Sequence, residues 1–444
     1  MKHILLFGAG KSATVLIEYL IQLAIHNQWK ITIADSNAAS IAEKTAGAPS
    51  SVQGLVVALE SEDQRTLLIQ QADLVISLMP PSLHFLIAQD CLAAGKHLLT
   101  ASYADVQMQT LAPAVKQKGI LFLNEMGLDP GIDHMSAMRL IHQIQAEGGV
   151  ITSFLSHCGG LVAPESDNNP WHYKISWNPR NVIMAGKAGA VYLENGQEKH
   201  KTYAQLFENN HLVSVPELAD YACYPNRDSL TYRSLYQLSE TKTFIRTTLR
   251  HPDFCIGWRY LISLHLTDEE KVYETNNLSL QAFFAQHTER FFGKTSHLPE
   301  ASTLVKQQLE YLGFSEDTLI NKGLCSAADI LQWVLENKLA LQPHDKDMII
   351  MVHEIVYTLH QQTHQVQSSL IVKGTNAVHT AMARTVGLPL GIAAKLVLEG
   401  AISETGLHIP TSPAFYIPVL QELEAMGICF TERNSSYKTT GISG

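Results

Sequence analysis

Two glycines near the N-terminus, Gly8 and Gly10, have the spacing of a phosphate-binding loop, with Ala13 three residues further on. They follow an apolar run at 3–7 that is typical of a β-strand, and a helical pattern occupies 13–26. In this setting Gly8 permits a tight turn, Gly10 lets the backbone approach a pyrophosphate, and Ala13 lets the helix pack on the strand. The N-terminus of such a helix favours phosphate. The spacing therefore predicts a dinucleotide-binding loop.

Asp35 ends the next strand-like run, at 30–34. An acid at this position accepts hydrogen bonds from the adenosine ribose and repels a 2′-phosphate, so it favours NAD over NADP as the cofactor. Lys11 and Ser12 lie within the loop, and we expect them to contact the cofactor as well. The alternatives are a glycine turn in another α/β domain, such as a methyltransferase, and an exposed loop acid at position 35.

The elements that must position these residues form a repeating pattern over the first 125 residues. Short apolar runs that are typical of buried parallel strands alternate with helical patterns. The runs lie at 3–7, 30–34, 55–59, 74–78, 97–100 and 120–123. The pattern predicts an α/β fold with an N-terminal Rossmann domain, which is a doubly wound sheet.

The composition of the chain changes at about residue 124. Segments rich in β-branched and aromatic residues at 152–157, 191–193 and 242–249 predict a mixed sheet, and 266–344 is expected to be helical. Strand patterns return at 347–358 and 365–372, and helices are expected near 376–400 and 413–427. We therefore expect three parts. They are a dinucleotide-binding domain at 1–124 and 390–444, a substrate-binding and dimerisation α/β domain at 125–265 and 345–389, and a helical domain at 266–344.

Composition and charge exclude several classes of function. A net charge of −10 argues against non-specific nucleic-acid binding, which needs a basic surface. The apolar stretch at 14–25 contains Glu18 and Gln22 and is shorter than a membrane span, and the N-terminus lacks the features of a signal peptide. No two of the six cysteines have C-x-x-C spacing, and the His353–Glu354 pair lacks the second histidine of a zinc-protease motif. We expect a cytoplasmic protein that needs no metal.

Longer motifs occupy the middle of the chain. They are TASY at 100–103, NEMGLDPGIDH at 124–134, CGGLVAPE at 158–165, YKISWNP at 173–179, YPNRDS at 224–229 and TTLR at 247–250. In this order the series resembles the L-glutamate-forming saccharopine dehydrogenases (saccharopine reductases), and particularly the dehydrogenase half of the bifunctional aminoadipic semialdehyde synthases. The similarity continues into KDM at 346–348 and ARTVGLP at 383–389.

The resemblance implies a reaction, a fold and a set of contacts. Saccharopine is oxidised at the glutamate-side carbon of its secondary amine, and hydrolysis of the imine gives L-glutamate and 2-aminoadipate 6-semialdehyde. The family fold implies a Rossmann domain, an α/β substrate domain, a helical domain and a homodimer. The positions that match the family's substrate contacts are Ser102, Tyr103, Asp129, Arg227, Thr248, Leu249 and Arg250. The acid at position 35 resembles the NAD-dependent, lysine-degrading branch of the family.

The local chemistry fits a substrate with three carboxylates. The segment 227–250 is rich in cations, and arginine binds carboxylates in bidentate fashion. In a regular strand Arg246 and Arg250 share one face, although a solvated charged strand is the alternative. Asp129 follows the last Rossmann strand and is our candidate acid–base residue, with a turn-forming role or a water as alternatives.

Three further residues are expected to line the site. Tyr103 is a second catalytic candidate, which would orient a carboxylate or a water unless it is a buried packing residue. Cys158 precedes two glycines and is interpreted as a pocket wall, since hydride transfer needs no covalent nucleophile. Pro80 is expected beside the nicotinamide ribose. His84 and His134 are interpreted as structural.

Three other functions remain open at this point. The first is an NADP-dependent saccharopine reductase of lysine biosynthesis. The second is an opine or carboxyspermidine-type dehydrogenase, although a polyamine substrate would call for acids where this chain has arginines. The third is a nicotinamide-sensing protein without catalysis.

Overall fold

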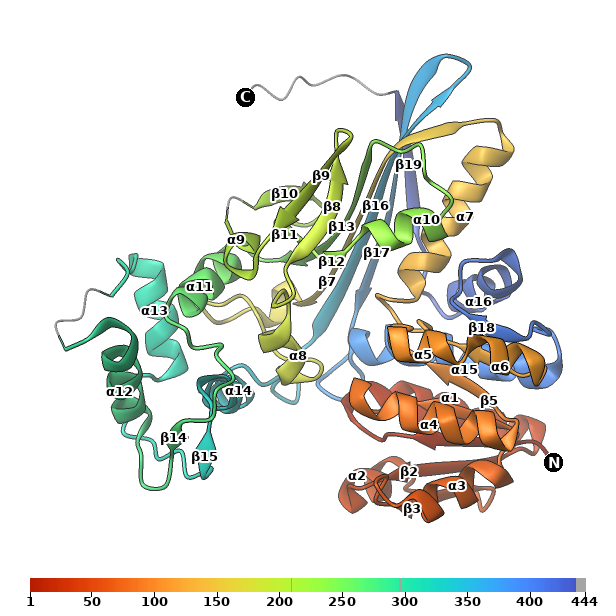
Figure 1. The fold of residues 1–444 in the computed structure, drawn as a ribbon, viewed down its shortest axis with the longest axis horizontal. Coiled ribbons are helices and arrows are strands. Elements are labelled where there is room, and N and C mark those ends of the chain that lie inside the picture. Colours follow the sequence, from red (N-terminus) through yellow and green to blue (C-terminus); the bar gives the residue numbers. More distant parts are fainter. Residues whose placement is uncertain (209, 295–297, 437–444) are drawn as a thin grey trace. The chain divides into compact units, whose positions relative to one another are not determined.

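The computed structural model describes residues 1–208, 210–294 and 298–436 (Figure 1). Its internal contacts divide the chain into two compact units. Among the described residues, the first unit comprises Met1–Gly149 and Val378–Phe430, and the second comprises Val150–Ala377 and Thr431–Ser436.

The first unit is built on a seven-stranded parallel sheet with the order β18-β6-β5-β4-β1-β2-β3. The strands are β1 (His3–Phe7), β2 (Lys30–Asp35), β3 (Val52–Val56), β4 (Leu74–Ser77), β5 (His97–Thr100), β6 (Leu121–Leu123) and β18 (Gly406–His408). All five residues of β1 are buried, as expected for a strand that is covered on both faces. The predicted doubly wound sheet is confirmed, and β18 adds a strand that the sequence did not predict.

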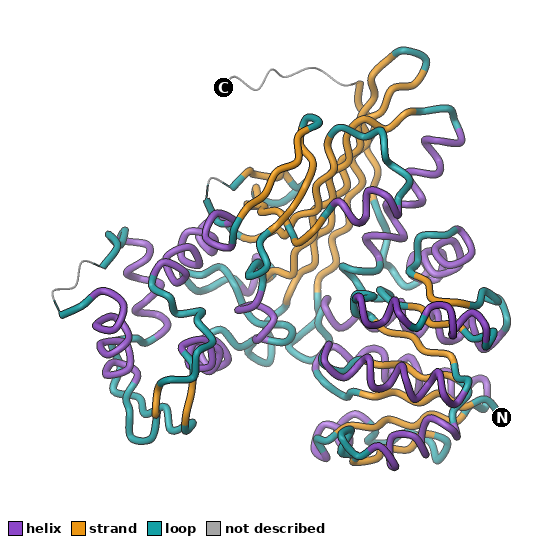
Figure 2. Tube along the Cα trace, in the orientation of Figure 1, coloured by secondary structure: helices purple, strands orange, loops and turns teal. Residues whose placement is uncertain are grey.

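Helices cover both faces of this sheet, and Figure 2 shows how they alternate with its strands. The helical elements of the first unit are η1 (Lys11–Ala13), α1 (Thr14–Asn27), α2 (Ala38–Lys44), α3 (Glu62–Gln71), α4 (Pro81–Ala94), α5 (Val106–Thr110), α6 (Ala112–Gln117), α7 (Ile132–Ala146), α15 (Ala381–Glu399) and α16 (Pro413–Ala425). Of these, α7 contacts α16. Helix α15 packs closely on α1, and glycine at position 387 permits this approach. A Cβ atom there would lie only 2.9 Å from the backbone nitrogen of Leu16. Among the described residues α15 alone has the length and composition of a membrane span, and 72% of its most apolar window is buried, as in a core helix.

The second unit contains a ten-stranded mixed sheet with the central order β10-β11-β13-β7-β16-β17-β19. Its strands are β7 (Val150–Val162), β8 (Ala190–Glu194), β9 (Gln197–Lys201), β10 (His211–Ser214), β11 (Asp220–Pro225), β12 (Arg227–Asp228), β13 (Thr243–Arg250), β16 (Asp347–Leu359), β17 (Gln362–Lys373) and β19 (Thr431–Ser436). Strands β13 and β7 run parallel, and β7 pairs with β16 in the antiparallel sense, so the predicted mixed sheet is confirmed.

The helical segment of the second unit surrounds an aromatic core that includes Trp171, Phe254 and Trp258. Its elements are α8 (Pro179–Met184), α9 (Tyr203–Leu206), α11 (Pro252–Ser263), α12 (Leu280–Phe292), α13 (Thr303–Leu312) and α14 (Ala327–Lys338), with a small sheet of β14 (Tyr273–Glu274) and β15 (Leu324–Cys325). Helix α10 (Leu230–Leu235) instead contacts strand β8 of the mixed sheet.

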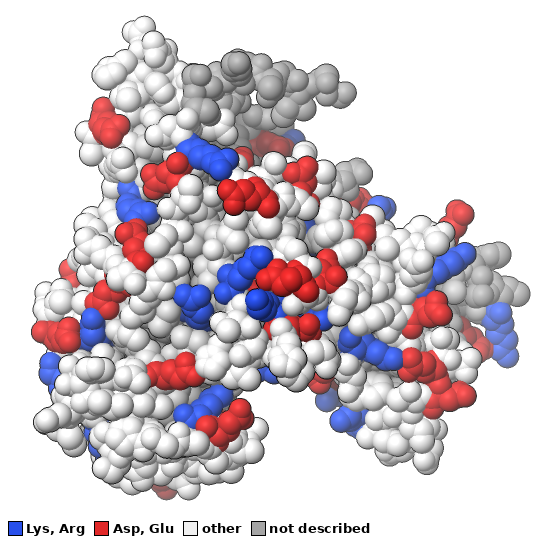
Figure 3. Space-filling model, turned by 180° about the vertical axis from the view of Figure 1, so that it is seen from behind, with Lys and Arg blue, Asp and Glu red and all other residues white. Residues whose placement is uncertain are grey.

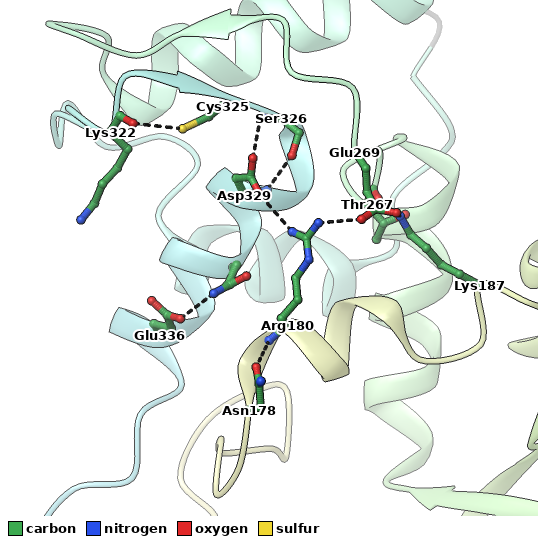
Figure 4. Close-up of polar contacts among 11 residues, drawn as sticks. Asn178, Arg180, Lys187, Thr267, Glu269, Lys322, Cys325, Ser326, Asp329 and Glu336 are labelled. Carbon is green, nitrogen blue, oxygen red and sulfur yellow. Dashed lines mark hydrogen bonds and ion pairs between the residues drawn. The ribbon is translucent and has the colours of Figure 1, made fainter. Parts of the chain in front are cut away.

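An ion-pair network ties α8 to α14 within this segment (Figure 4). Arg180 contacts Asp329 at 3.0 Å and Glu269 at 2.6 Å, and Lys187 contacts Glu269 at 3.0 Å. Because these cations are paired with carboxylates of the chain itself, we interpret the network as structural and not as a ligand site. Figure 3 shows basic and acidic side chains interspersed over the face it draws.

The boundaries of the units differ from the predicted domains. Helix α15 begins at Ala381 and lies wholly in the first unit, whereas the sequence predicts the return at residue 390. Helix α7 also belongs to the first unit, and 266–344 does not separate from the second. The last described strand, β19, belongs to the second unit, where it pairs with β17. Sequence patterns mark elements, whereas unit boundaries depend on which elements pack together.

Candidate active site

The turn after β1 has the geometry of a phosphate-binding loop. Gly8 has a φ of 107°, and a Cβ atom there would lie 2.9 Å from the carbonyl oxygen of Leu78, so only glycine fits. A Cβ atom at Gly10 would meet no atom of the described residues within 4 Å. This open space is what a pyrophosphate needs beside the backbone. Ala13 is 1% exposed and closes the short 3₁₀ turn before α1. The loop therefore fits a dinucleotide.

Asp35 is bonded to this loop. Its Oδ2 accepts a hydrogen bond from the backbone N–H of Ala9 at 2.6 Å, and its Oδ1 accepts one from Asn37 N–H at 2.8 Å. Lys44, which the sequence analysis did not single out, reaches the same place from α2. Its ammonium group donates to the carbonyl oxygens of Ala9, at 2.8 Å, and of Gly10. The adenosine side of the site thus carries a carboxylate and an ammonium group together.

The ends of β4 and β5 are joined by His84 on α4. Its Nδ1 lies 2.8 Å from Ser77 Oγ, and its Nε2 lies 2.6 Å from Ser102 Oγ. Burial lowers the pKa of His84 to about 4, with a smaller opposing effect from Asp105, so the imidazole is neutral at physiological pH. His84 therefore positions the predicted substrate contact Ser102 without adding charge. Pro80 caps the same helix and is exposed.

The two loops that carry Tyr103 and Asp129 are fastened to each other by Glu125. Its backbone N–H donates to Ser102 O at 3.1 Å, and its carboxylate accepts from Ala104 N–H at 3.1 Å. The same carboxylate contacts the buried His134 ring at 2.7 Å. Tyr103 and Asp129 are each half-buried.

Asn124, just after β6, is a candidate that the sequence analysis quoted in a motif but did not single out. Its side chain is buried, with the residue 1% exposed, and neither amide atom has a hydrogen-bond partner among the described residues. A buried amide without a partner is costly and is normally satisfied by a ligand or a water. The carboxyl ends of parallel strands are where ligands bind in such sheets. Burial is the signal that singles out Asn124, and it is not visible in the sequence.

In the second unit, Arg250 is a buried cation without a counterion among the described residues. The residue is 4% exposed, and its guanidinium lies over the rings of Tyr173 and Phe254, at 5.3 and 5.6 Å from their centroids. Its Nη1 donates to Leu249 O at 2.9 Å, whereas its Nε has no partner in the described part of the chain.

The groups around Arg250 are neutral. Burial raises the pKa of Tyr224 to about 12 and that of Cys255 to about 12, so neither is an anion at physiological pH. Arginine stays charged in proteins, and a buried charge without a partner is unfavourable. An anionic ligand such as a carboxylate would relieve this cost.

The other predicted contacts of the second unit lie on or near the same strands. Cys158 on β7 is opposite Thr248 on β13, which is half-buried. Leu249 faces a separate hydrophobic cluster, which includes Leu161 and Met348, so its side chain packs in the core. Only its backbone carbonyl is directed to Arg250.

The remaining arginines differ in burial. Arg246 is 2% exposed and stacks on Tyr232 at 4.3 Å, so the alternative of a solvated charged strand is wrong for this residue and for Arg250. Arg227 is exposed, in the two-residue strand β12, with a φ of 52°.

The predicted site residues are divided between the two units. The first carries the cofactor loop, Asp35, Pro80, Ser102, Tyr103 and Asp129, and the second carries Cys158, Arg227, Thr248, Leu249 and Arg250.

Known proteins match the chain along nearly its whole length. The saccharopine dehydrogenase NADP binding domain matches residues 4–123, and the saccharopine dehydrogenase C-terminal domain matches residues 127–428. The saccharopine dehydrogenase (NADP(+), L-glutamate-forming) of Schizosaccharomyces pombe is 31% identical over 97% of this chain and 99% of its own length. The alpha-aminoadipic semialdehyde synthase of Arabidopsis thaliana is 33% identical over 97% of this chain, which spans 44% of that protein.

A solved structure agrees with these matches. Apo saccharopine dehydrogenase (L-Glu forming) from Saccharomyces cerevisiae superimposes with a TM-score of 0.86 at 28% identity, covering 98% of this chain and 100% of that one. The names of the fungal relatives and of the matching N-terminal domain carry NADP, whereas the acid at position 35 predicts NAD. The names of the relatives and the acid at position 35 agree on a nicotinamide dinucleotide as the class of cofactor. From the two domain matches, the identities and the shared fold, this chain belongs to the L-glutamate-forming saccharopine dehydrogenase family of oxidoreductases.

Proposed function

We propose that this chain oxidises saccharopine with NAD and hydrolyses the resulting imine to L-glutamate and 2-aminoadipate 6-semialdehyde. The observation that carries the proposal is Arg250, a buried guanidinium without a counterion among the described residues. Saccharopine has three carboxylates, and one of them would supply the missing negative charge. A polyamine substrate would instead place a cation beside this arginine, which is unfavourable.

The reaction balances without any further oxidant. Saccharopine loses a hydride from one of the two carbons bonded to its secondary amine, the nitrogen loses a proton, and a C=N bond forms. Water then adds to the carbon of this bond, and the C–N bond breaks. The carbon that lost the hydride becomes a carbonyl, and the other fragment keeps the nitrogen as a primary amine.

For L-glutamate to be the product, the C=N bond that is hydrolysed must join the nitrogen to the aldehyde-side carbon. The hydride therefore leaves the carbon that becomes the semialdehyde, and the glutamate nitrogen departs as the amine. The glutamate-side carbon, which the resemblance implied as the position of oxidation, is therefore wrong, because oxidation there would give a 2-oxo acid and not glutamate. The nicotinamide ring, when bound, accepts this hydride.

Asp129 is the residue proposed to take up the proton, directly or through water, because it is half-buried beyond the end of the Rossmann sheet. Tyr103 would orient the attacking water or a carboxylate. Glu125 keeps the two loops in register through its hydrogen bonds to Ser102 and Ala104.

The preference for NAD rests on Asp35, whose carboxylate would meet a 2′-phosphate with like charge. A preference for NADP is the alternative, and one feature of the chain favours it besides the names of its relatives. The ammonium group of Lys44 lies on the same loop, and a 2′-phosphate could pair with it. The direction of the reaction in lysine metabolism, a cytoplasmic location and the predicted homodimer remain proposals.

A turnover assay tests the proposal. Saccharopine is supplied with NAD or NADP, and the rate of reduced cofactor formation is followed together with the release of glutamate. We expect glutamate and NADH in equal amounts and a higher kcat/KM with NAD. Release of 2-oxoglutarate in place of glutamate, or equal or better turnover with NADP, would contradict the respective part of the proposal.

The role of Arg250 is tested by Arg250→Ala, with Arg259→Ala as the matched control. Arg259 is an exposed arginine of the same unit that pairs with Glu208. We expect Arg250→Ala to lower kcat/KM for saccharopine by about 100-fold, as for the loss of one desolvated charge-assisted contact worth roughly 3 kcal/mol. NADH binding should be unchanged. Unchanged turnover of saccharopine by Arg250→Ala would show that Arg250 does not bind a carboxylate of the substrate.

A further inference from the structure

Two histidines and two aspartates gather in the second unit, outside the residues assigned above. His172 Nε2 lies 3.4 Å from Asp253 Oδ2, and His251 Nδ1 lies 3.9 Å from the same oxygen. One ligand atom from each of these three residues lies within 4.8 Å of the other two. Their side chains are 28 to 33% exposed, so an ion could enter from solvent.

Asp167 orients the first of these histidines. Its Oδ2 lies 2.7 Å from His172 Nδ1, which leaves the Nε2 atom directed to Asp253. A carboxylate that accepts from the outer nitrogen of a metal-binding histidine is a recurrent second layer of metal sites. The other oxygen, Oδ1, is buried without a hydrogen-bond partner in the described part of the chain.

We propose that His172, His251 and Asp253 bind one divalent transition-metal ion of the Zn²⁺ class. Imidazole and carboxylate are ligands that Zn²⁺ accepts, and three protein ligands with one open position are a common coordination. Ligands at about 2.0–2.2 Å in a tetrahedral arrangement lie roughly 3.3–3.6 Å apart. The 3.4 Å between His172 and Asp253 already has this spacing.

Binding requires His251 to turn. The rings of His172 and His251 are stacked with their centroids 3.8 Å apart and their planes 25° apart, so their lone pairs do not converge on one point. The His251 ring accepts one hydrogen bond in the described structure, from Asp253 N–H at 3.2 Å. This contact caps the start of α11 and is the one that the metal would displace.

Two residues of the cluster are sequence neighbours of Arg250 and of its stacking partner Tyr173. His172 precedes Tyr173, which stacks on the guanidinium, and His251 follows Arg250 itself. Metal binding would therefore restrain the two backbone segments that carry Arg250 and Tyr173. The site itself does not depend on the proposed reaction, since its ligands are separate from the substrate contacts.

The test is a Zn²⁺ titration of the full chain, freed of metal with a chelator. It is carried out in a Cys429→Ser background, because Cys429 is an exposed thiol that could bind zinc. We expect calorimetry to show saturation at one ion per chain, and Co²⁺ in place of Zn²⁺ to give the visible absorption of a four-coordinate site. Absence of saturable binding would overturn the proposal and leave the cluster as a helix cap.

Variants then locate the ion. His172→Asn and His251→Asn each remove an imidazole, and asparagine at position 251 still caps α11. Each should weaken binding by about tenfold or more, and Asp167→Asn should weaken it by about 10- to 100-fold. The matched control is His200→Ala, which removes an exposed histidine that pairs with Glu198 in the same unit. Equal affinity of His172→Asn, His251→Asn and the parent chain, with circular dichroism showing folded protein, would place the ion elsewhere and refute the site.

Discussion

The carboxylate of Asp35 accepts a hydrogen bond from the backbone N–H of Ala9 at 2.6 Å. The end of β2 is thereby tied to the turn between β1 and α1. This acid is thus more than a contact for the adenosine ribose, because it also holds the loop that receives the pyrophosphate.

Replacement of Asp35 tests both roles. Asp35→Asn keeps the shape and removes the charge, and a hydrogen bond to a charged group is worth about 1.5–3 kcal/mol. We expect the Kd for NADH to rise about tenfold or more, and the ratio of NADPH to NADH affinity to move towards NADPH. Fluorescence titration measures both, with the exposed Asp63→Asn as the control. If neither the Kd for NADH nor the ratio of NADPH to NADH affinity changes, Asp35 plays no part in cofactor choice.

Substitution of Gly10 is expected to change cofactor affinity without changing the stability of the fold. Its φ of −68° is open to any residue, and an added Cβ would meet no atom of the described chain within 4 Å. We therefore expect Gly10→Ala to leave the urea midpoint unchanged while weakening NADH binding by about tenfold, which corresponds to about 1.4 kcal/mol. Gly8→Ala is the contrasting variant, and it should also lower stability because of the contact with Leu78 O. Full NADH affinity in Gly10→Ala would mean that the pyrophosphate does not lie beside this residue.

Asn124 is expected to show a trade-off between stability and activity. Replacing a buried polar group without partners by an apolar one of similar size removes a desolvation cost of about 1–3 kcal/mol. Asn124→Leu should therefore raise the free energy of unfolding and lower turnover, as is common for groups that serve a ligand. Urea unfolding and the saccharopine assay measure the two effects. A destabilised variant with full activity would instead identify Asn124 as a structural residue that an internal water satisfies.

His84 makes stability depend on pH in a definite direction. Burial lowers its pKa to about 4 from the ordinary value of 6.5. As the pH falls through this interval the unfolded chain takes up a proton that the folded chain does not, so stability falls by up to about 3 kcal/mol. His84→Asn should have a shallower decrease of the urea midpoint between about pH 7 and pH 4.5. An equal decrease in both proteins would place the acid sensitivity on other groups.

The fold class was readable from the sequence because it rests on local periodicity. Short apolar runs separated by helical patterns predict a parallel sheet wherever they occur, and the strand at His3–Phe7 was predicted to the residue. Where the pattern was weak or the pairing distant, prediction failed. Strand β18 has three residues, and β19 pairs with a strand more than sixty residues earlier.

The glycine spacing and Asp35 predicted a dinucleotide cofactor, because backbone turns and charge type are properties of the residues themselves. The motifs at 124–134 and 247–250 carried the resemblance to the family. Burial and pairing were decided only by the tertiary structure. Among the described residues it left Arg250 without a counterion and Asn124 without a partner, and it brought His172 to His251 across 79 positions of sequence. No local pattern encodes such distances, because they follow from which strands and helices pack against one another.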